Sequence, residues 1–312
     1  MRGLEDWSLV PAAEMAELYR RDALRWRNDL DWDTAAASAA LERARCSGHV
    51  NGLVVRQANG AIAGWTYFLL RGSELQIGAL TASSPLATRA LLDGVFASPA
   101  AAVARRALCF AYSDAPGVTT ALTEHGFDVG AEYYLMRALD PVPGPAVRSL
   151  RPWVDSDVAA VAEVLHAAYR GPDARRAFVP SGALPEWRDY VRQLAGSSGC
   201  GAFVPSLSPV APGDGRLDGV ALVTRVSTTS AHLAQLAVRP EARGQRLGAR
   251  LLDRVMGDAA RAGFARLSLL VSETNERARR LYDRAGFTTQ GSFLNATRSR
   301  QHDARRRGAP AA

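Results

Sequence analysis

The chain has 312 residues, 47% of them hydrophobic, which is enough apolar material for two modest cores. It carries a net charge of +7, and because the sequence contains no lysine, its 38 strongly basic side chains are all arginines. No run of about eighteen apolar residues occurs and the first residues lack the features of a signal peptide, so we expect a cytoplasmic protein with no membrane partner.

Cysteine spacing and charge distribution exclude two further classes of site. Cys46, Cys109 and Cys200 lie far apart and show no CxxC spacing, so we expect a reducing compartment and no bound metal. The excess positive charge lies beyond residue 140. That half lacks a basic stripe interleaved with aromatic residues, a helix-turn-helix pattern and zinc-ligand spacing, so the sequence predicts no nucleic-acid partner.

The first half of the chain combines helices with short strands. Periodicity predicts helices between residues 11 and 45 and at 85–96, and strands at 52–57, 62–70, 75–80 and 106–112. Residues 141–146 hold three prolines and a glycine, which is typical of an interdomain linker.

The second half repeats this order of elements. We predict helices at 155–170, 185–195, 248–262 and 276–285, strands at 200–204, 219–225, 232–238 and 266–271, and a final strand pair over 287–297. The stretches ELQIGAL and LTEHGFD of the first half correspond to LAQLAV and LYDRAGFT of the second. A period near 150 residues indicates a domain duplication, with domains at 1–140 and 147–298, the linker at 141–146 and a basic, disordered tail at 299–312. An unrelated α/β domain is the alternative for the first half.

Residues 239–252, RPEARGQRLGARLL, place four arginines and two glycines where a strand gives way to a helix. The first turn of a helix offers unpaired backbone N–H groups and the positive end of its dipole, so it attracts phosphates. Glycines allow close approach of the backbone, and arginines add charge-assisted hydrogen bonds. In isolation, a solvated loop is an equal alternative. The corresponding stretch of the first half, TASSPLATRALL, has no such glycines and lacks the cluster of arginines.

The second half resembles the GNAT acetyltransferase superfamily. The resemblance covers residues 147 to about 298 and rests on the motif LAV.P, the loop from Arg243 to Gly248 and the motif N.RARRLY.R.GF. It implies an α/β (α+β) fold of two GNAT-like domains, each a central mixed, mostly antiparallel sheet flanked by helices. The first domain is then a degenerate copy that does not bind coenzyme A.

The resemblance also implies acetyl-CoA, or another acyl-CoA, as co-substrate. Its implied contacts are Leu236, Ala237, Val238, Arg243, Gly244, Gln245, Arg246, Leu247, Gly248, Ala249 and Asn275. Arg246 stands where the family usually has glycine. If position 246 is already helical, an arginine there costs no backbone strain and is a tolerated variant; if it needs a positive φ, the expected cofactor binding is in doubt. Asn275 is also placed to cap the following helix, which is an equal alternative to a cofactor contact.

Three residues are candidates for acid–base chemistry. By resemblance, Tyr282 is the general acid that protonates the departing thiolate, whereas its spacing alone favours a core aromatic residue. His232 lies where a general base stands in one branch of the family, but a single histidine at a strand end is more often structural. Glu273 is the next candidate for the base, and water is the third.

The expected function is transfer of an acetyl group to a primary amine, most simply of a small molecule, by direct attack in a ternary complex. A peptide N-terminal acetyltransferase and a non-catalytic acyl-CoA sensor are the alternatives. The sequence leaves open whether the protein is a monomer or a homodimer.

Overall fold

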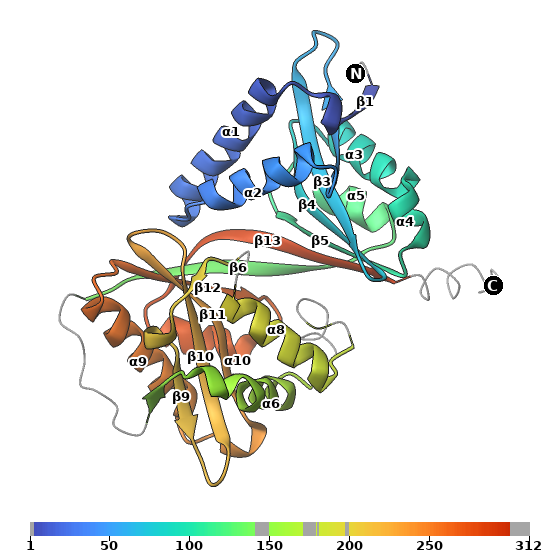
Figure 1. Ribbon diagram of the computed structural model, residues 1–312. Helices are drawn as coiled ribbons and strands as arrows, with labels where there is room; N and C mark the ends of the chain where they lie inside the picture. The colour runs from blue at the N-terminus through green and yellow to red at the C-terminus, as the bar shows by residue number, and fades with distance from the viewer. Residues whose placement is uncertain (1–2, 141–149, 171–178, 180, 197–199, 300–312) are drawn as a thin grey trace. The chain divides into compact units, whose positions relative to one another are not determined.

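The computed structural model describes residues 3–140, 150–170, 179, 181–196 and 200–299 (Figure 1). The chain forms two compact units. Unit 1 comprises Met1–Arg25, Thr34–Tyr133 and Gly291–Ala312, and unit 2 comprises Trp26–Asp33 and Tyr134–Gln290. Each unit therefore takes residues from both halves of the chain. The predicted linker at 141–146 and nearly all of the predicted tail lie outside the described residues.

Unit 1 has a sheet with the strand order β1-β2-β3-β4-β5-β13. Its strands are β1 (Gly3–Asp6), β2 (Asn51–Arg56), β3 (Ile62–Arg71), β4 (Glu74–Ala82), β5 (Arg106–Tyr112) and β13 (Thr288–Ser299), the last entering from Gly291. Helices α3 (Pro85–Ala97), α4 (Pro99–Val103) and α5 (Val118–Glu124) cover one face, and α1 (Ala12–Leu30) and α2 (Ala35–Cys46) cover the other. Val54 and Val55 are neighbours in β2 that face these two different cores, as the alternation of a strand requires.

Unit 2 repeats this layering with the strand order β6-β12-β11-β10-β9-β7, and β8 pairs with β10. Its strands are β6 (Asp128–Ala138, entering from Tyr134), β7 (Arg151–Pro152), β8 (Ala202–Phe203), β9 (Pro209–Pro212), β10 (Leu217–Arg225), β11 (Ser230–Val238) and β12 (Arg266–Ser272). Helices α6 (Val158–Ala168) and α8 (Leu184–Gly196) cover one face and α9 (Leu247–Arg261) the other, followed by α10 (Glu276–Arg284). The fold class predicted from the sequence is confirmed.

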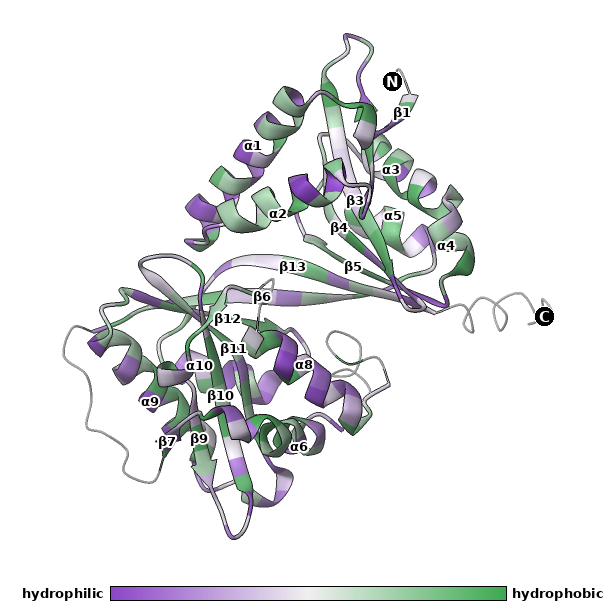
Figure 2. Ribbon diagram, in the orientation of Figure 1, coloured by the Kyte–Doolittle hydropathy of each residue, from purple (hydrophilic) through white to green (hydrophobic). Residues whose placement is uncertain are grey.

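The helices of unit 2 are positioned by their apolar faces. Helix α8 buries Trp187, Val191 and Leu194 and shows both purple and green in Figure 2, as an amphipathic helix should. Helix α9 packs closely on β10, because a Cβ atom at Gly219 would lie 3.0 Å from a Leu251 methyl group. The absence of a side chain at Gly219 therefore sets how near α9 lies to the sheet.

Two local predictions were wrong. The stretch 205–216, in which no strand is predicted, contains the strand β9, which pairs with β10 on one side and β7 on the other. Its two prolines are its first and last residues, and the start of a strand tolerates proline. The final strand pair is instead one long strand, β13, which runs through Gly291 without a turn. The boundary between the two units falls at Gly291, within this continuous strand.

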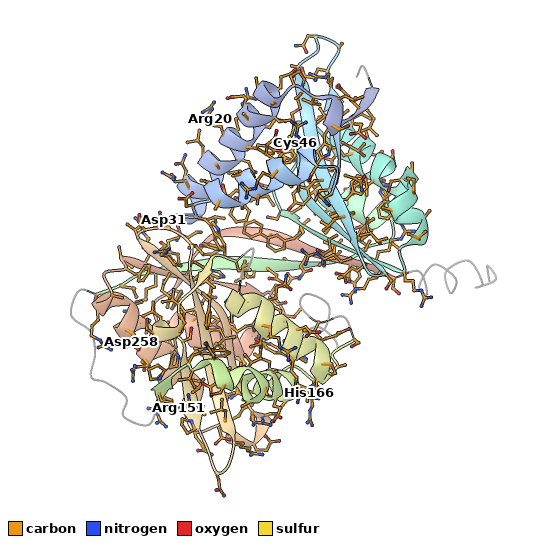
Figure 3. The ribbon with its side chains drawn as sticks, viewed as in Figure 1. Arg20, Asp31, Cys46, Arg151, His166 and Asp258 are labelled. Carbon is orange, nitrogen blue, oxygen red and sulfur yellow. The ribbon has the colours of Figure 1, made fainter. Side chains whose placement is uncertain are left out.

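The segment Trp26–Asp33 joins unit 2 although it lies more than a hundred residues from the rest of that unit. The carboxylate of Asp31, labelled in Figure 3, accepts hydrogen bonds from the Thr229 hydroxyl at 2.9 Å, the Ser230 hydroxyl at 2.6 Å and the Arg266 guanidinium at 2.7 Å. The Tyr134 hydroxyl donates to the carbonyl of Leu30 at 3.0 Å. These contacts fix the segment to the first residues of β11 and β12.

Replacing Asp31 with asparagine should destabilise unit 2 by about 1–3 kcal/mol, because the charge-assisted hydrogen bonds are lost. Backbone strain does not confound this comparison, since asparagine tolerates the positive φ of 51° that Asp31 adopts. Burial opposes ionisation, but the bonds from Ser230, Arg266 and Thr229 outweigh it and lower the pKa of Asp31. The stabilisation is therefore present above the usual carboxyl pKa of 3.8 and lost as the pH falls through the lower folded value.

Urea unfolding of wild type and Asp31→Asn between pH 7 and pH 2.5 measures this effect. The gap in unfolding free energy should be largest at neutral pH and close below pH 3.8. Asp189→Asn is the matched control, since Asp189 is exposed and pairs with Arg192 on the surface; it should change stability by less than about 0.5 kcal/mol. A gap that does not vary with pH would contradict the role given to the Asp31 charge.

Candidate functional site

The pairing of β11 with β12 ends part-way along both strands. They run parallel and are in register from Ser230 to Leu233, opposite Arg266 to Leu269, and the register among the described residues stops there. Strand β11 continues as far as Val238 and stays paired with β10. A bulge at Ala234 falls where the parallel pairing with β12 stops. The backbone of β11 beyond Leu233 is thereby turned away from β12. The predicted contacts Leu236, Ala237 and Val238 lie on this part of the strand.

The loop after β11 leads directly into α9. Gly244 has a φ of 85° and Arg246 a φ of 57°, and Arg246 is the N-cap of the helix. Of the two alternatives for position 246, the structure has the one with positive φ. Arg246 adopts the left-handed conformation that glycine accepts most easily, so the turn keeps the shape that a glycine would give it, with backbone strain at Arg246. Arg246 provides no side-chain hydrogen bond to the first turn. Gln245 and Arg246 are exposed, and Leu247, Gly248 and Ala249 begin the helix.

Arg243 lies across the gap between β11 and α6. Its Nε donates to the carbonyl of Val238 at 3.3 Å, and one terminal nitrogen donates to the carbonyl of Ala168 at 3.0 Å. Ala168 is the last residue of α6, where carbonyl groups lack helical partners. The guanidinium therefore ties the end of α6 to the end of β11 and places positive charge there.

The corresponding helix of unit 1 begins differently. Strands β4 and β5 also run parallel only up to Ile77 and Cys109, so unit 1 keeps the partial pairing. However, the Ser84 hydroxyl caps α3 by accepting from the N–H of Ala87 at 3.3 Å. Pro85 packs closely on Gly117: a Cβ atom added at Gly117 would lie 2.7 Å from the proline ring. The first turn of α3 is thus satisfied and covered, whereas that of α9 has no side-chain cap.

Helix α10 packs against the beginning of α9. The Asn275 side chain caps it by accepting from the N–H of Ala278 at 3.2 Å. A Cβ atom at Gly248 would lie 3.8 Å from side-chain atoms of both Leu281 and Val238, so α9, α10 and β11 come together at this glycine. Tyr282 is 7% exposed, and burial first, then the neighbouring Tyr169, raises its pKa. The phenol therefore stays protonated at neutral pH and can act as a proton donor.

His232 lies at the other end of β11. It is 3% exposed, its Nδ1 is 3.0 Å from the Ser268 hydroxyl, and its ring packs 5.0 Å from that of Trp32 and 6.0 Å from that of Tyr134. The Ser268 hydroxyl also lies 3.3 Å from the carbonyl of Ala231, to which it can donate. Burial lowers the pKa of His232 to about 3. These contacts favour a structural role. Glu273 is exposed and directly follows β12.

Sequence analysis missed a polar cluster on the α6 and α8 side of β11. Gln235 is 3% exposed and lies between the hydroxyl groups of Tyr169 and Tyr190. The only sequence signal is its position directly before LAV, because its two partners, Tyr169 and Tyr190, lie 66 and 45 residues earlier in the chain.

The chain is similar to acetyltransferases along the stretch that contains this site. The model of the acetyltransferase (GNAT) family matches residues 165–287. An enzyme of Pseudomonas phage PaMx11, named 5-NmdU N-acetyltransferase, is 33% identical over 108 residues, which is 34% of this chain and 74% of that protein. The chain belongs to the GNAT family.

Other relatives agree with this assignment. An uncharacterized N-acetyltransferase of Mycobacterium tuberculosis (strain H37Rv) is 34% identical over 79 residues, which is 25% of this chain. The chain spans about half the length of this mycobacterial relative, 51%. Among solved structures, a GCN5-related N-acetyltransferase from Sphaerobacter thermophilus has a TM-score of 0.62 at 19% identity and covers 95% of both chains. A tandem GNAT protein from the clavulanic acid biosynthesis pathway has a TM-score of 0.54 at 17% identity and covers 84% of both chains. Both show the same fold as this chain.

The described ranges of this GNAT protein contain no group of three or more His, Cys, Asp or Glu side chains that could hold a metal ion. No helix in those ranges has the length and apolar character needed to cross a bilayer.

The burial of His232 predicts a distinct pH dependence of stability. The pKa of His232 is about 3 in the folded protein and has its usual value of 6.5 in the unfolded chain. Between pH 3 and pH 6.5 the unfolded chain therefore binds more protons than the folded protein. Stability should fall as the pH drops from 6.5 towards 3, by about 1.4 kcal/mol per pH unit. His232→Asn keeps a polar atom near Ser268 but cannot titrate, so its unfolding free energy should be flatter across that window.

Urea unfolding at pH 7.5 and pH 4.5 measures this difference, and His166→Asn is the control. His166 is half-buried on α6, with Nδ1 3.0 Å from the carbonyl of Gly182. An equal pH dependence in wild type and His232→Asn would show that folding leaves the pKa of His232 unshifted, and would restore it as a candidate base.

Proposed function

We propose that this GNAT protein transfers an acetyl group from acetyl-CoA to a primary amine of a small molecule. The observation that carries the proposal is the uncapped start of α9, with Gly244 and Arg246 in left-handed conformations, beside a strand whose backbone is not paired with its parallel neighbour. Successive N–H groups in such a turn form a concave anion-binding surface. This fits the pyrophosphate of a coenzyme A thioester.

The residues present fit an acyl-CoA along its whole reactive arm. Gly244 to Ala249 would hold the phosphates, and the backbone of Leu236 to Val238 would bind the pantetheine amides and orient the acyl carbonyl. Asn275 already caps α10, so a cofactor contact by its side chain would be additional to that hydrogen bond. The thioester supplies the acyl group, and the chain supplies binding and orientation.

Tyr282 is the general acid of the proposed reaction. The acceptor nitrogen attacks the thioester carbon, the carbon–sulfur bond breaks, and the Tyr282 hydroxyl gives its proton to the leaving thiolate. A phenol is protonated at neutral pH, and burial raises the pKa of this one further. A positioned acid of this kind contributes about 10² to 10⁴ in rate. The proton of the acceptor amine leaves to water or to Glu273, which is exposed. His232 has no part in this transfer.

Unit 1 is proposed to retain the fold without binding acyl-CoA. Ser84 occupies the first turn of α3, and Pro85 packs against Gly117. A phosphate at that helix would have to displace both contacts. A peptide N-terminal acetyltransferase and a non-catalytic acyl-CoA sensor are the alternative functions, and they differ from the proposal in acceptor size and in turnover.

Acetyl-CoA at about 100 times its dissociation constant should stabilise the protein by about 2.7 kcal/mol, or several degrees in Tm. Tyr282→Phe should keep this shift and lose about 10² to 10⁴ in turnover, measured as thiol release with a panel of small amines and peptides. Tyr134→Phe is the control, since Tyr134 is also a buried tyrosine of unit 2 and its hydroxyl donates to the backbone at Leu30. No thermal shift with any acyl-CoA would refute the proposal, and a shift without turnover in wild type would favour the sensor.

Replacing Arg246 should change the stability of the free protein and its affinity for acetyl-CoA in opposite directions. Replacing it with glycine relieves the left-handed conformation, so the free protein should gain up to about 1 kcal/mol. If the guanidinium contacts a phosphate, acetyl-CoA affinity should fall about 10-fold to 100-fold. Arg246→Ala separates the two effects, because it loses the same affinity but keeps the Cβ atom and gains no stability. Calorimetric titration that finds wild-type affinity in Arg246→Gly would mean that the arginine merely replaces a glycine.

A further inference from the structure

The segment 239–246 joins β11 to α9 and contains the turn proposed to hold the cofactor phosphates. Most of it is exposed, namely Pro240, Glu241 and residues 243–246. The connection in unit 1 is much shorter, because β4 ends at Ala82 and α3 begins at Pro85. An exposed connection loses conformational entropy when it is ordered. Contacts with the rest of unit 2 must therefore fix this segment if its turn is to form before a ligand binds.

Arg239 fixes the start of the segment. Its backbone N–H donates to the carbonyl of Asp218 at 2.9 Å, and its Nε donates to the carbonyl of Leu217 at 2.7 Å. One terminal nitrogen donates to the carboxylate of Glu163 on α6 at 3.3 Å. The Arg239 side chain is only 12% exposed, so water competes little for the bond to Leu217. The guanidinium thus joins the segment to a strand and to a helix.

The other end of the segment meets the same part of β10. Leu247 is the first residue of α9, and a Cβ atom added at Gly219 would lie 3.4 Å from a Leu247 methyl group. Leu217, Asp218 and Gly219 are consecutive in β10, so both ends of the segment rest on three neighbouring residues of one strand. A loop whose ends are both held in place has fewer conformations than one held at a single end.

The backbone carries the position of Arg239 to the anion-binding turn. A short 3₁₀ helix, Pro240–Ala242, follows directly, and the N–H of Ala242 donates to the carbonyl of Arg239 at 3.1 Å. Gly244 and Arg246 come next, with their positive φ values. A left-handed conformation is unfavourable for a residue with a Cβ atom, so Arg246 keeps it only where the surrounding structure imposes it.

We propose that Arg239 is a positioning residue for the acyl-CoA: it holds the segment 239–246 so that the turn at Gly244 and Arg246 is formed before the cofactor binds. Arg239 acts through this segment, since its Nε and one terminal nitrogen are used within the protein. Its effect is confined to the phosphates, because pairing with β10 holds Leu236–Val238 independently of the guanidinium. This inference rests on the proposed function and adds a residue outside the predicted cofactor contacts.

Two acetyl donors test the proposal, acetyl-CoA and S-acetylpantetheine, which lacks the phosphates. Arg239→Met keeps the length of the side chain and loses its donors. A turn that must be ordered on binding weakens affinity and leaves the chemical step unchanged. The KM for acetyl-CoA should therefore rise about tenfold or more with kcat within about twofold, while kcat/KM for S-acetylpantetheine stays within about twofold. Calorimetric titration with coenzyme A should show the same tenfold loss without any turnover.

Arg239→Lys separates positioning from a direct contact with phosphate. Lysine keeps the charge, but its compact ammonium group cannot reproduce the fork that reaches both Leu217 and Glu163. The KM for acetyl-CoA should still rise about fivefold or more, and this variant supplies the measurement if Arg239→Met does not fold. A direct phosphate contact would largely survive the change.

Arg151→Met is the matched control. Arg151 is also an arginine of unit 2, and it donates to the carbonyl of Pro152 at 3.1 Å and to the carboxylate of Asp157 at 2.7 Å. It lies outside the segment 239–246, so its replacement should lower the unfolding free energy and leave the KM for both donors within about twofold of wild type.

The outcomes separate this inference from the function on which it rests. Absence of coenzyme A binding in wild type, and of thiol release with both donors, overturns both. With an active wild type, an unchanged KM for acetyl-CoA in Arg239→Met overturns the inference and leaves the acetyltransferase proposal standing. An equal loss with both donors shows general damage to the fold, and a wild-type KM in Arg239→Lys shows a direct phosphate contact. Either result also overturns the positioning role.

Discussion

The limited length of the parallel pairing between β11 and β12 is the constraint on which the candidate site depends. The register ends at Leu233 and Leu269, and a bulge at Ala234 accompanies this end. Backbone groups of a strand need hydrogen-bond partners, so a strand that leaves its neighbour in a folded protein is either covered or available to a ligand. On β11 the released stretch runs up to the loop in which Gly244 and Arg246 have positive φ values. The same geometry thus provides both a surface for an extended ligand and a turn for an anion at its end.

Unit 1 shows that this geometry alone does not make a site. Its strands β4 and β5 stop pairing at the equivalent place, after Ile77 and Cys109. The difference lies in the next few residues, where Ser84 caps α3 and Pro85 packs on Gly117. A side-chain cap satisfies the N–H groups that a phosphate would otherwise bind. The two units therefore share the arrangement of the sheet, but the start of α3 has a side-chain cap and the start of α9 has none.

Sequence patterns identified what is set locally. The starts of α9 and α10, the cap at Asn275 and the burial of Tyr282 all follow from short-range spacing, and the structure has each of them. The conformation of Arg246 was left open because nothing in the local sequence demands a left-handed arginine. Strand β9 was missed because its two prolines usually argue against a strand; they lie at its two ends. The Gln235 cluster was missed because its partners are far away in sequence.

His232 shows how a correct local inference can still give the wrong chemistry. The bulge at Ala234 puts His232 and Gln235 opposite Thr224 and Leu222, two residues that share one face of β10. The side chain of His232 therefore points to the same side of the sheet as Gln235 and its two partners, Tyr169 and Tyr190. However, Trp32 covers the end of β11 at which His232 lies. Trp32 belongs to a segment two hundred residues earlier in the chain, and Asp31 fixes that segment to β11 and β12. The covering ring excludes water and keeps the imidazole neutral, so the feature that decides its role is a long-range contact and not its place in a motif.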